Sequence, residues 1–186
     1  MVLTDREIQV SIQNKQIIVD PPPAPTAFSS TSLDLSLSKY IRIWKAATIK
    51  GIEDKIVSPG AAGYKFNDVL REYSDGKEIG ADGYVVEPGT FVLGWTLETI
   101  ELPILTRVAA RVEGKSSLAR LGIGIHITAP TIHAGFQGPI QLEIFNHGLV
   151  RVKLLTGMPV FQLIFEQTLG TPAKGYAGQF FGQTQK

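Results

Sequence analysis

Hydrophobic residues alternate with polar ones along much of the chain, at the period of two that is typical of strands with one buried face. The alternation is clearest at Leu33, Leu35 and Leu37, and it puts Asp34 on the opposite face of the same strand. Similar short patterns, separated by turn residues, recur along the rest of the sequence. They predict strands at residues 84–86, 91–97, 108–112, 124–128, 139–146, 150–154 and 160–167.

Helical patterns are few and short. Thr4 and Glu7 have the spacing of a capping box, which predicts a helix that begins directly after Thr4. Residues 66–73 fit two turns of a second helix, and Ser116 or Ser117 is expected to cap a third. Short strands joined by turns, with few short helices, predict a mainly all-β fold, a distorted β-barrel with jelly-roll character.

The chain is expected to form one domain, residues 1–186, which is long enough to bury about 70% of the unfolded surface in a single core. Residues 47–83 show little periodicity and are predicted to be a peripheral insertion. The strands expected at residues 84–86 and 91–97 flank a Pro-Gly turn, so we expect them to form a hairpin.

Composition and charge narrow the classes of partner. The formal net charge is +1 and the charges are interspersed, so there is no basic surface for a nucleic-acid duplex or a membrane. No apolar run has the length of a membrane span and no signal-like N-terminus is seen, which predicts a cytoplasmic protein. The chain has no cysteine, which excludes disulfides and the thiolates of a cytidine-deaminase-type zinc site.

Two cations and two hydroxyls lie close together at Lys115, Ser116, Ser117 and Arg120. A turn that leads into a helix also presents free backbone N–H groups, so this cluster suits the binding of a polyphosphate. The alternative is a capped helix with solvated charges, and the spacing alone favours neither interpretation.

Glu143 is the second candidate for chemistry. It lies among apolar residues of an expected strand, where a carboxylate is costly without a partner or a catalytic role. Gln141 shares its face, so the alternative is an edge-strand glutamate that faces solvent, and the alternation does not decide between the two. A phosphate-binding cluster and an isolated acid so close in sequence indicate a nucleotide-processing site.

Several motifs, in the right order, resemble those of the dCTP deaminase branch of the trimeric dUTPase-like superfamily. That family has a segment R/K-S-S-x-x-R-L-G, a turn I-D-x-G-F/W-x-G and a strand that contains L-E. The resemblance covers roughly the whole chain apart from the residues around 50–83. The matching motifs are at residues 32–35, 88–94, 115–122, 132–138, 142–143, 157–163 and 176–179.

The resemblance implies hydrolytic deamination of dCTP to dUTP and ammonia by a homotrimer with active sites at the subunit interfaces. Glu143 would be the general base and acid, Ser116 would orient the reacting water, and Arg120 would lie beside the acid. Lys115 and Ser117 would bind phosphates, with Mg²⁺ bound through the substrate triphosphate and no zinc. The resemblance also implies that dTTP can act as an inhibitor.

Further substrate contacts are implied by the same resemblance. The backbone of Ile127, Thr128 and Ala129 would read the edge of the base. Phe136 would pack under the deoxyribose, although a plain core aromatic would look the same in the sequence. Gln162 resembles the glutamine of a phosphate-binding motif, and a core-strand amide explains it equally well.

The C-terminal tail, residues 170–186, resembles a lid that closes over the active site in the family. Tyr176 and Gln179 would be contacts of this lid, and Lys174 would be a phosphate ligand. The family pattern is Lys-Tyr-x-x-Gln, whereas here one residue separates the lysine from the tyrosine.

His133 departs from the family pattern, which usually has an aspartate that contacts the sugar 3′-hydroxyl and, in dUTPases, activates the hydrolytic water. A histidine can still hydrogen-bond the hydroxyl but is not a fixed anionic base, so diphosphate release is not expected. The alternative is a surface histidine in a turn. The spacing of His126, His133 and His147 matches no metal-site pattern, so no metal ligand is predicted.

Two alternative functions remain open. One is a bifunctional enzyme that also splits dUTP to dUMP and diphosphate, or a plain dUTPase; the lack of an acid at position 133 disfavours it. The other is a non-catalytic nucleotide-binding regulatory trimer, which the presence of Glu143, Ser116 and Arg120 disfavours.

Overall fold

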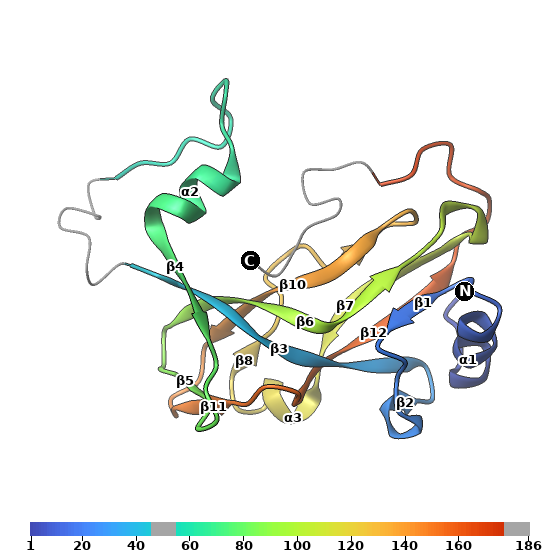
Figure 1. Cartoon of the computed structure of the whole chain (residues 1–186), viewed down its shortest axis with the longest axis horizontal. Coiled ribbons are helices and arrows are strands. Elements are labelled where there is room, and N and C mark those ends of the chain that lie inside the picture. Colours follow the sequence, from blue (N-terminus) through green and yellow to red (C-terminus); the bar gives the residue numbers. More distant parts are fainter. Residues whose placement is uncertain (46–54, 177–186) are drawn as a thin grey trace.

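The computed structural model describes residues 1–45 and 55–176. Strands dominate the regular structure, and the helices are short (Figure 1). The described helices are α1 (Asp5–Gln13), α2 (Phe66–Tyr73) and α3 (Ser116–Ala119), with 3-10 turns at Pro25–Ala27 and Ile104–Thr106. The described strands are β1 (Ile18–Asp20), β2 (Phe28–Ser29), β3 (Ser32–Trp44), β4 (Ser74–Glu78), β5 (Tyr84–Val86), β6 (Phe91–Glu101), β7 (Val108–Gly114), β8 (Ile123–Gly124), β9 (Thr131–Ile132), β10 (Gln137–Asn146), β11 (Val152–Leu154) and β12 (Pro159–Gln167).

Ten of the described strands form one antiparallel sheet that curls into half a barrel (Figure 1). The main path through this sheet runs β8-β10-β6-β3-β12-β7-β9. β1 pairs with β6, and both β2 and β4 pair with β3. β5 and β11 form a separate two-stranded sheet. The predicted fold, mainly β with barrel-like curvature and a few short helices, is confirmed.

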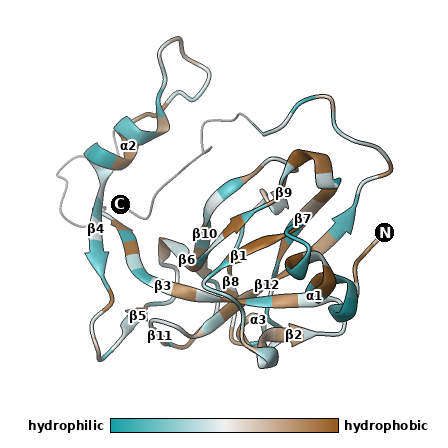
Figure 2. Ribbon diagram, turned by 45° about the vertical axis from the view of Figure 1, so that its right-hand side comes forward, coloured by the Kyte–Doolittle hydropathy of each residue, from teal (hydrophilic) through white to brown (hydrophobic). Residues whose placement is uncertain are grey.

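The predicted alternation is realised in β3. Leu33, Leu35 and Leu37 are fully buried, while Asp34 lies half-buried on the other face. Figure 2 shows hydrophobic and hydrophilic bands alternating along this strand. Each buried side chain of this kind stabilises the fold by roughly 1.5–3 kcal/mol. Because β10 and β12 bury one face in the same way, the strands that carry the candidate site rest on this core.

The predicted helices are present, with one difference in capping. α1 begins with the expected capping box, in which the Thr4 N–H donates to the Glu7 carboxylate at 3.3 Å, and α2 coincides with the predicted second helix. α3 begins one residue earlier than a serine cap requires: its N-cap is Lys115, whose side chain makes no cap hydrogen bond. The prediction of a serine cap is therefore wrong. The helices of the described residues include none that is long and apolar enough to cross a membrane.

The hairpin predicted across the Pro-Gly turn does not form, because β5 pairs with β11 instead of β6. The reason lies in Asn146, a fully buried residue at the end of β10. Its side-chain amide donates to the carbonyls of Val86 and Val150, both at 2.9 Å. The backbone carbonyl of Asn146 accepts a hydrogen bond from the N–H of Gly89 at 2.8 Å. These bonds hold β5 beside the segment that leads into β11.

The strand predicted at residues 124–128 is wrong beyond Gly124, where β8 ends. The backbone N–H of Ile127 donates to the carboxylate of Glu143 and not to a neighbouring strand. A side chain thus occupies the donor that a strand ladder would use, and the segment leaves the sheet as an irregular loop.

β4 lies within the segment 47–83, where the sequence shows no strand pattern. It pairs with β3 along residues 40–44 and adds an edge strand to the main sheet. α2 lies beyond that edge (Figure 1). Residues 46–54 are outside the described part of the chain, and the division into one domain with a peripheral insertion stays a prediction.

Candidate active site

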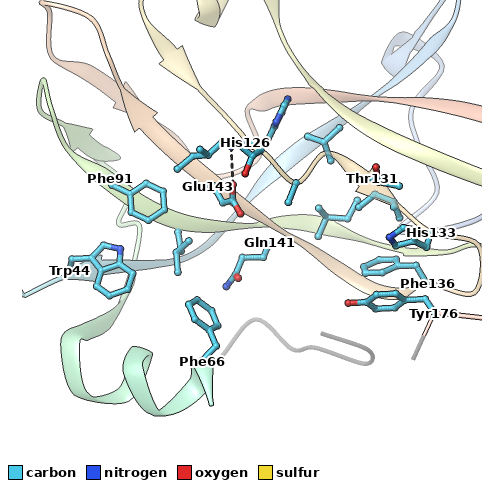
Figure 3. A pocket seen from close by; sticks show the side chains of 17 residues that line it. Trp44, Phe66, Phe91, His126, Thr131, His133, Phe136, Gln141, Glu143 and Tyr176 are labelled. Carbon is cyan, nitrogen blue, oxygen red and sulfur yellow. Dashed lines mark hydrogen bonds between the residues drawn. The ribbon is translucent and has the colours of Figure 1, made fainter. Parts of the chain in front are cut away.

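A pocket of about 550 Å³ opens between β10, β6, the loop after β8 and the start of α2 (Figure 3). Its size is within the range of roughly 300–1,000 Å³ that is typical of small-molecule sites. Most of its wall is apolar or aromatic, with a few polar side chains that can orient a ligand. Of the residues that the sequence predicts for the site, Ile127, Thr128, Ala129, His133, Phe136, Glu143 and Tyr176 line this pocket.

Glu143 is half-buried on β10 and reaches into the pocket (Figure 3). Its backbone N–H donates to the carbonyl of Ile125 at 2.9 Å, and its Oε2 accepts the N–H of Ile127 at 2.8 Å. Its Oε1 accepts no hydrogen bond from any other described residue. One oxygen therefore fixes the carboxylate, while the other can bind a water or take a proton.

The loop beside Glu143 offers backbone groups to a ligand. Thr128 and Ala129 line the pocket and are exposed. Neither their N–H groups nor their carbonyls bond to another residue in the described part of the chain. A heterocyclic edge with alternating donors and acceptors can satisfy such groups.

Three rings meet at the other end of the pocket (Figure 3). His133 stacks on Tyr176, with 5.8 Å between ring centroids and 15° between the planes. Phe136 is buried and packs against the same tyrosine at 6.0 Å and 46°. The rings together form a largely apolar surface that can contact a sugar.

An aromatic wall opposite these rings has no counterpart in the sequence-based prediction. Trp44 and Phe91 stack at 6.3 Å, and Phe66 comes from the first residue of α2 (Figure 3). The indole Nε1 of Trp44 is buried and has no hydrogen-bond partner among the described residues. Local patterns carry no signal for this wall, since its members come from three separate elements that meet only in the folded chain.

The predicted phosphate ligands lie elsewhere on the chain. Lys115, Ser116, Ser117 and Arg120, the α3 patch, do not line the described pocket. Lys115 Nζ forms an ion pair with the carboxylate of Asp34, and the other three side chains are exposed.

Gln162 lies in the same part of the sheet as this ion pair. It is paired with Asp34 across β12 and β3, and its Oε1 accepts a hydrogen bond from Ser32 Oγ at 3.1 Å. Because Glu143 lines the pocket and the α3 patch does not, the two lie in separate parts of a single chain.

Two further predicted residues, Lys174 and Gln179, are outside the pocket or outside the described chain. Lys174 is exposed and does not line the pocket, and Gln179 lies beyond the described residues. His126 lines the pocket with a buried Nδ1 that bonds to no described residue, whereas His147 packs on Phe145 at 4.2 Å. Within residues 1–45 and 55–176, no three His, Asp or Glu side chains are grouped so that they could hold a metal ion.

The curled antiparallel sheet is that of the dUTPase-like fold class. A solved structure with this fold is 2′-deoxycytidine 5′-triphosphate deaminase from Agrobacterium tumefaciens, with a TM-score of 0.67 and 22% sequence identity. The match covers 90% of this chain and 48% of that chain, so this chain spans about half the length of that structure's chain. At this identity the likeness shows the fold alone.

Sequence comparison identifies the family. A family model described as dCTP deaminase-like matches residues 2–168. The dUMP-forming dCTP deaminase of Tropheryma whipplei (strain Twist) is 38% identical over 178 residues, which are 96% of this chain and 83% of that protein. The dCTP deaminase of Shewanella frigidimarina (strain NCIMB 400) is 37% identical over 177 residues, 95% of this chain and 88% of that protein. The chain belongs to the dCTP deaminase-like family, which confirms the predicted resemblance.

Proposed function

We propose that the protein is a hydrolase that converts dCTP and water to dUTP and ammonia. The observation that carries the proposal is Glu143, a carboxylate with one oxygen fixed by Ile127 and the other open to the pocket. The name of the Shewanella relative supports this reaction, and the names of both the Shewanella and the Tropheryma relatives support the deamination of dCTP.

The reaction needs one group that takes a proton and returns it. Water adds to C4 of the cytosine as Glu143 removes a proton from it, and the carboxyl passes that proton to N3. Glu143 then takes the remaining hydroxyl proton and delivers it to the amine, so that the C4–N4 bond breaks and ammonia leaves. A carboxyl shuttle of this kind requires no zinc-bound hydroxide, in keeping with a chain that lacks cysteine.

Recognition of the nucleoside follows from the rest of the pocket. The unbonded backbone groups of Thr128 and Ala129 read the edge of the base and present C4 to Glu143. Phe136 packs against the deoxyribose. Backbone groups are fixed before the ligand arrives, so they orient the base without loss of side-chain entropy.

We further propose that the active site is shared between chains of a homotrimer. The support is the separation of the α3 patch from the pocket within one chain. A neighbouring chain would bring Ser116 to position the water and Arg120 to lie beside Glu143. Its Lys115 and Ser117 would bind phosphates as charge-assisted and hydroxyl donors.

Mg²⁺ would accompany the triphosphate and neutralise part of its charge. Hard divalent cations take carboxylate oxygens as ligands, and Asp34 at the α3 patch has a buried Oδ1 without a hydrogen-bond partner among the described residues. Because this oxygen is buried and the other oxygen is paired with Lys115, we propose that the cation is bound through the oxygens of the triphosphate.

A second candidate is the bifunctional reaction that ends at dUMP, which the name of the Tropheryma relative supports. The side chain of His133 is not a fixed anionic base, so we favour the reaction that stops at dUTP. Product analysis after incubation with dCTP and Mg²⁺ decides between them. Ammonia with dUTP is expected, ammonia with dUMP and diphosphate would establish the bifunctional reaction, and the lack of ammonia would overturn both.

A further inference from the structure

His133, Phe136 and Tyr176 form one cluster of rings at the rim of the pocket, here called the ring platform (Figure 3). Tyr176 contacts both of the other rings, with 5.8 Å between its centroid and that of the imidazole and 6.0 Å between its centroid and that of the phenyl ring. His133 is near parallel to the tyrosine and Phe136 is tilted against it, both of which are favourable arrangements for ring pairs.

The backbone brings Tyr176 to this position from far along the chain. Its N–H donates to the carbonyl of Ala134 at 3.1 Å. Gly135 has φ +89°, and a Cβ there would lie only 2.8 Å from the Tyr176 nitrogen. The close approach of the two segments thus depends on glycine at position 135.

The described contact of His133 is made by the face of its ring. No hydrogen bond or ion pair joins this imidazole to another residue in the described part of the chain. A carboxylate has no face that could cover a tyrosine ring in this way, whereas an imidazole does. The ring at position 133 therefore supplies packing that an acid could not.

We infer that His133 is a positioning residue: it holds the Tyr176 ring against Phe136, and the resulting platform receives the sugar of the substrate by apolar contact. This inference rests on the proposed function. A site that contacts the sugar through apolar groups discriminates only weakly against a substrate that lacks the 3′-hydroxyl. A site that hydrogen-bonds this hydroxyl discriminates strongly against such a substrate. The site is accordingly specific for a cytosine nucleotide through the base and tolerant at the sugar 3′ position.

Two substitutions at position 133 separate stacking from hydrogen bonding. His133→Asn keeps a polar group but removes the ring, and it raises KM for dCTP by about 2- to 10-fold with little change in kcat, the range expected for loss of one ring pair. His133→Phe keeps a ring and loses the polar atoms, and it recovers most of that loss. His147→Asn, at a histidine outside the pocket, is the matched control. A loss in His133→Phe as large as in His133→Asn would overturn the inference.

Tyr176 and the sugar provide the independent checks. Tyr176→Ala raises KM, and adding His133→Asn to it costs little more, because the second residue acts through the first. Wild-type protein uses 2′,3′-dideoxycytidine triphosphate with kcat/KM within about tenfold of dCTP. Additive effects of the two substitutions, or rejection of the dideoxy substrate by more than about a thousandfold, would contradict the platform.

Failure of the proposed function has a different signature. If wild-type protein releases no ammonia from dCTP, that function is wrong, and the platform is then judged by hydrogen exchange at the Tyr176 amide, which is bonded to Ala134. Exchange is expected to be faster in His133→Asn and near wild type in His133→Phe. Equal exchange in all three proteins would show that His133 does not hold the tyrosine.

Discussion

Lys115 is the member of the α3 patch whose charge already has a protein partner. Its side chain and that of Asp34 are 23% and 17% exposed, and they form an ion pair. A triphosphate that reached this patch would offer Lys115 a second anion, with stronger charge-assisted hydrogen bonds than water can provide. The ion pair with Asp34 would hold the lysine in position before the triphosphate binds.

Lys115→Gln is predicted to raise KM for dCTP by about tenfold or more with little loss of kcat, because a hydrogen bond to a charged group contributes roughly 1.5–3 kcal/mol. Lys115→Arg should recover part of the loss. The control is Lys39→Gln, which breaks the exposed ion pair with Glu78. Equal KM values in Lys115→Gln and Lys39→Gln would contradict the assignment of Lys115.

Single residues differ in how far the sequence could identify them. Glu143 and Phe136 were predicted by motif, and the structure places both in the pocket. Trp44 and Phe66 were not predicted, because Trp44 precedes the segment 47–83, which has little periodicity, and Phe66 lies within it. The two residues meet only through the pairing of β3 and β4. A local pattern cannot report such a contact.

At the scale of elements, one buried amide determines how β5 is paired. Asn146→Ala removes the two hydrogen bonds that the side-chain amide donates to the carbonyls of Val86 and Val150. We predict a decrease of about 2–4 kcal/mol in the free energy of unfolding, measured by urea denaturation. Asn67→Ala, at an exposed position of α2, should change it by less than about 0.5 kcal/mol. Equal stabilities of the two variants would show that the amide does not secure β5.

The strands themselves were well predicted, since alternation reports burial directly and β3, β7, β10 and β12 all follow it. Their partners were harder to predict. The turn chemistry before β6 favours a hairpin, yet the bonds of Asn146 outweigh it. The loop after β8 was mistaken for strand because the Glu143 carboxylate takes an N–H that alternation assigns to the ladder.

At the scale of the whole molecule, the proposed trimer can be tested by complementation. Glu143→Gln chains lack the acid, and Arg120→Ala chains lack the α3 patch cation that is proposed to lie beside it, so each protein alone should be inactive. If sites are shared, an intact site forms where an Arg120→Ala chain supplies Glu143 and a Glu143→Gln neighbour supplies the α3 patch. In trimers assembled from an equal mixture, about a quarter of the sites are of this kind. Ammonia release should recover to that level after the two are refolded together.

The complementation assay has a clear contrary outcome. If each site is built from a single chain, no mixture contains an intact site, and activity stays at the level of the separate variants. A protein that carries both substitutions on the same chain is the control and should not be rescued by either variant. The sequence could not show that the acid and the α3 patch lie apart, because both fall within one short stretch of the chain.

The most direct test of the account is the rate of ammonia release from dCTP by wild-type protein and by Glu143→Gln, with dCTP binding measured on both. Glu143→Gln keeps the shape of the side chain and removes the proton carrier, so kcat should fall by about a hundredfold or more while the dissociation constant changes little. Glu78→Gln, at an exposed position away from the pocket, should retain full activity. Turnover by Glu143→Gln near the wild-type rate would contradict the proposed mechanism.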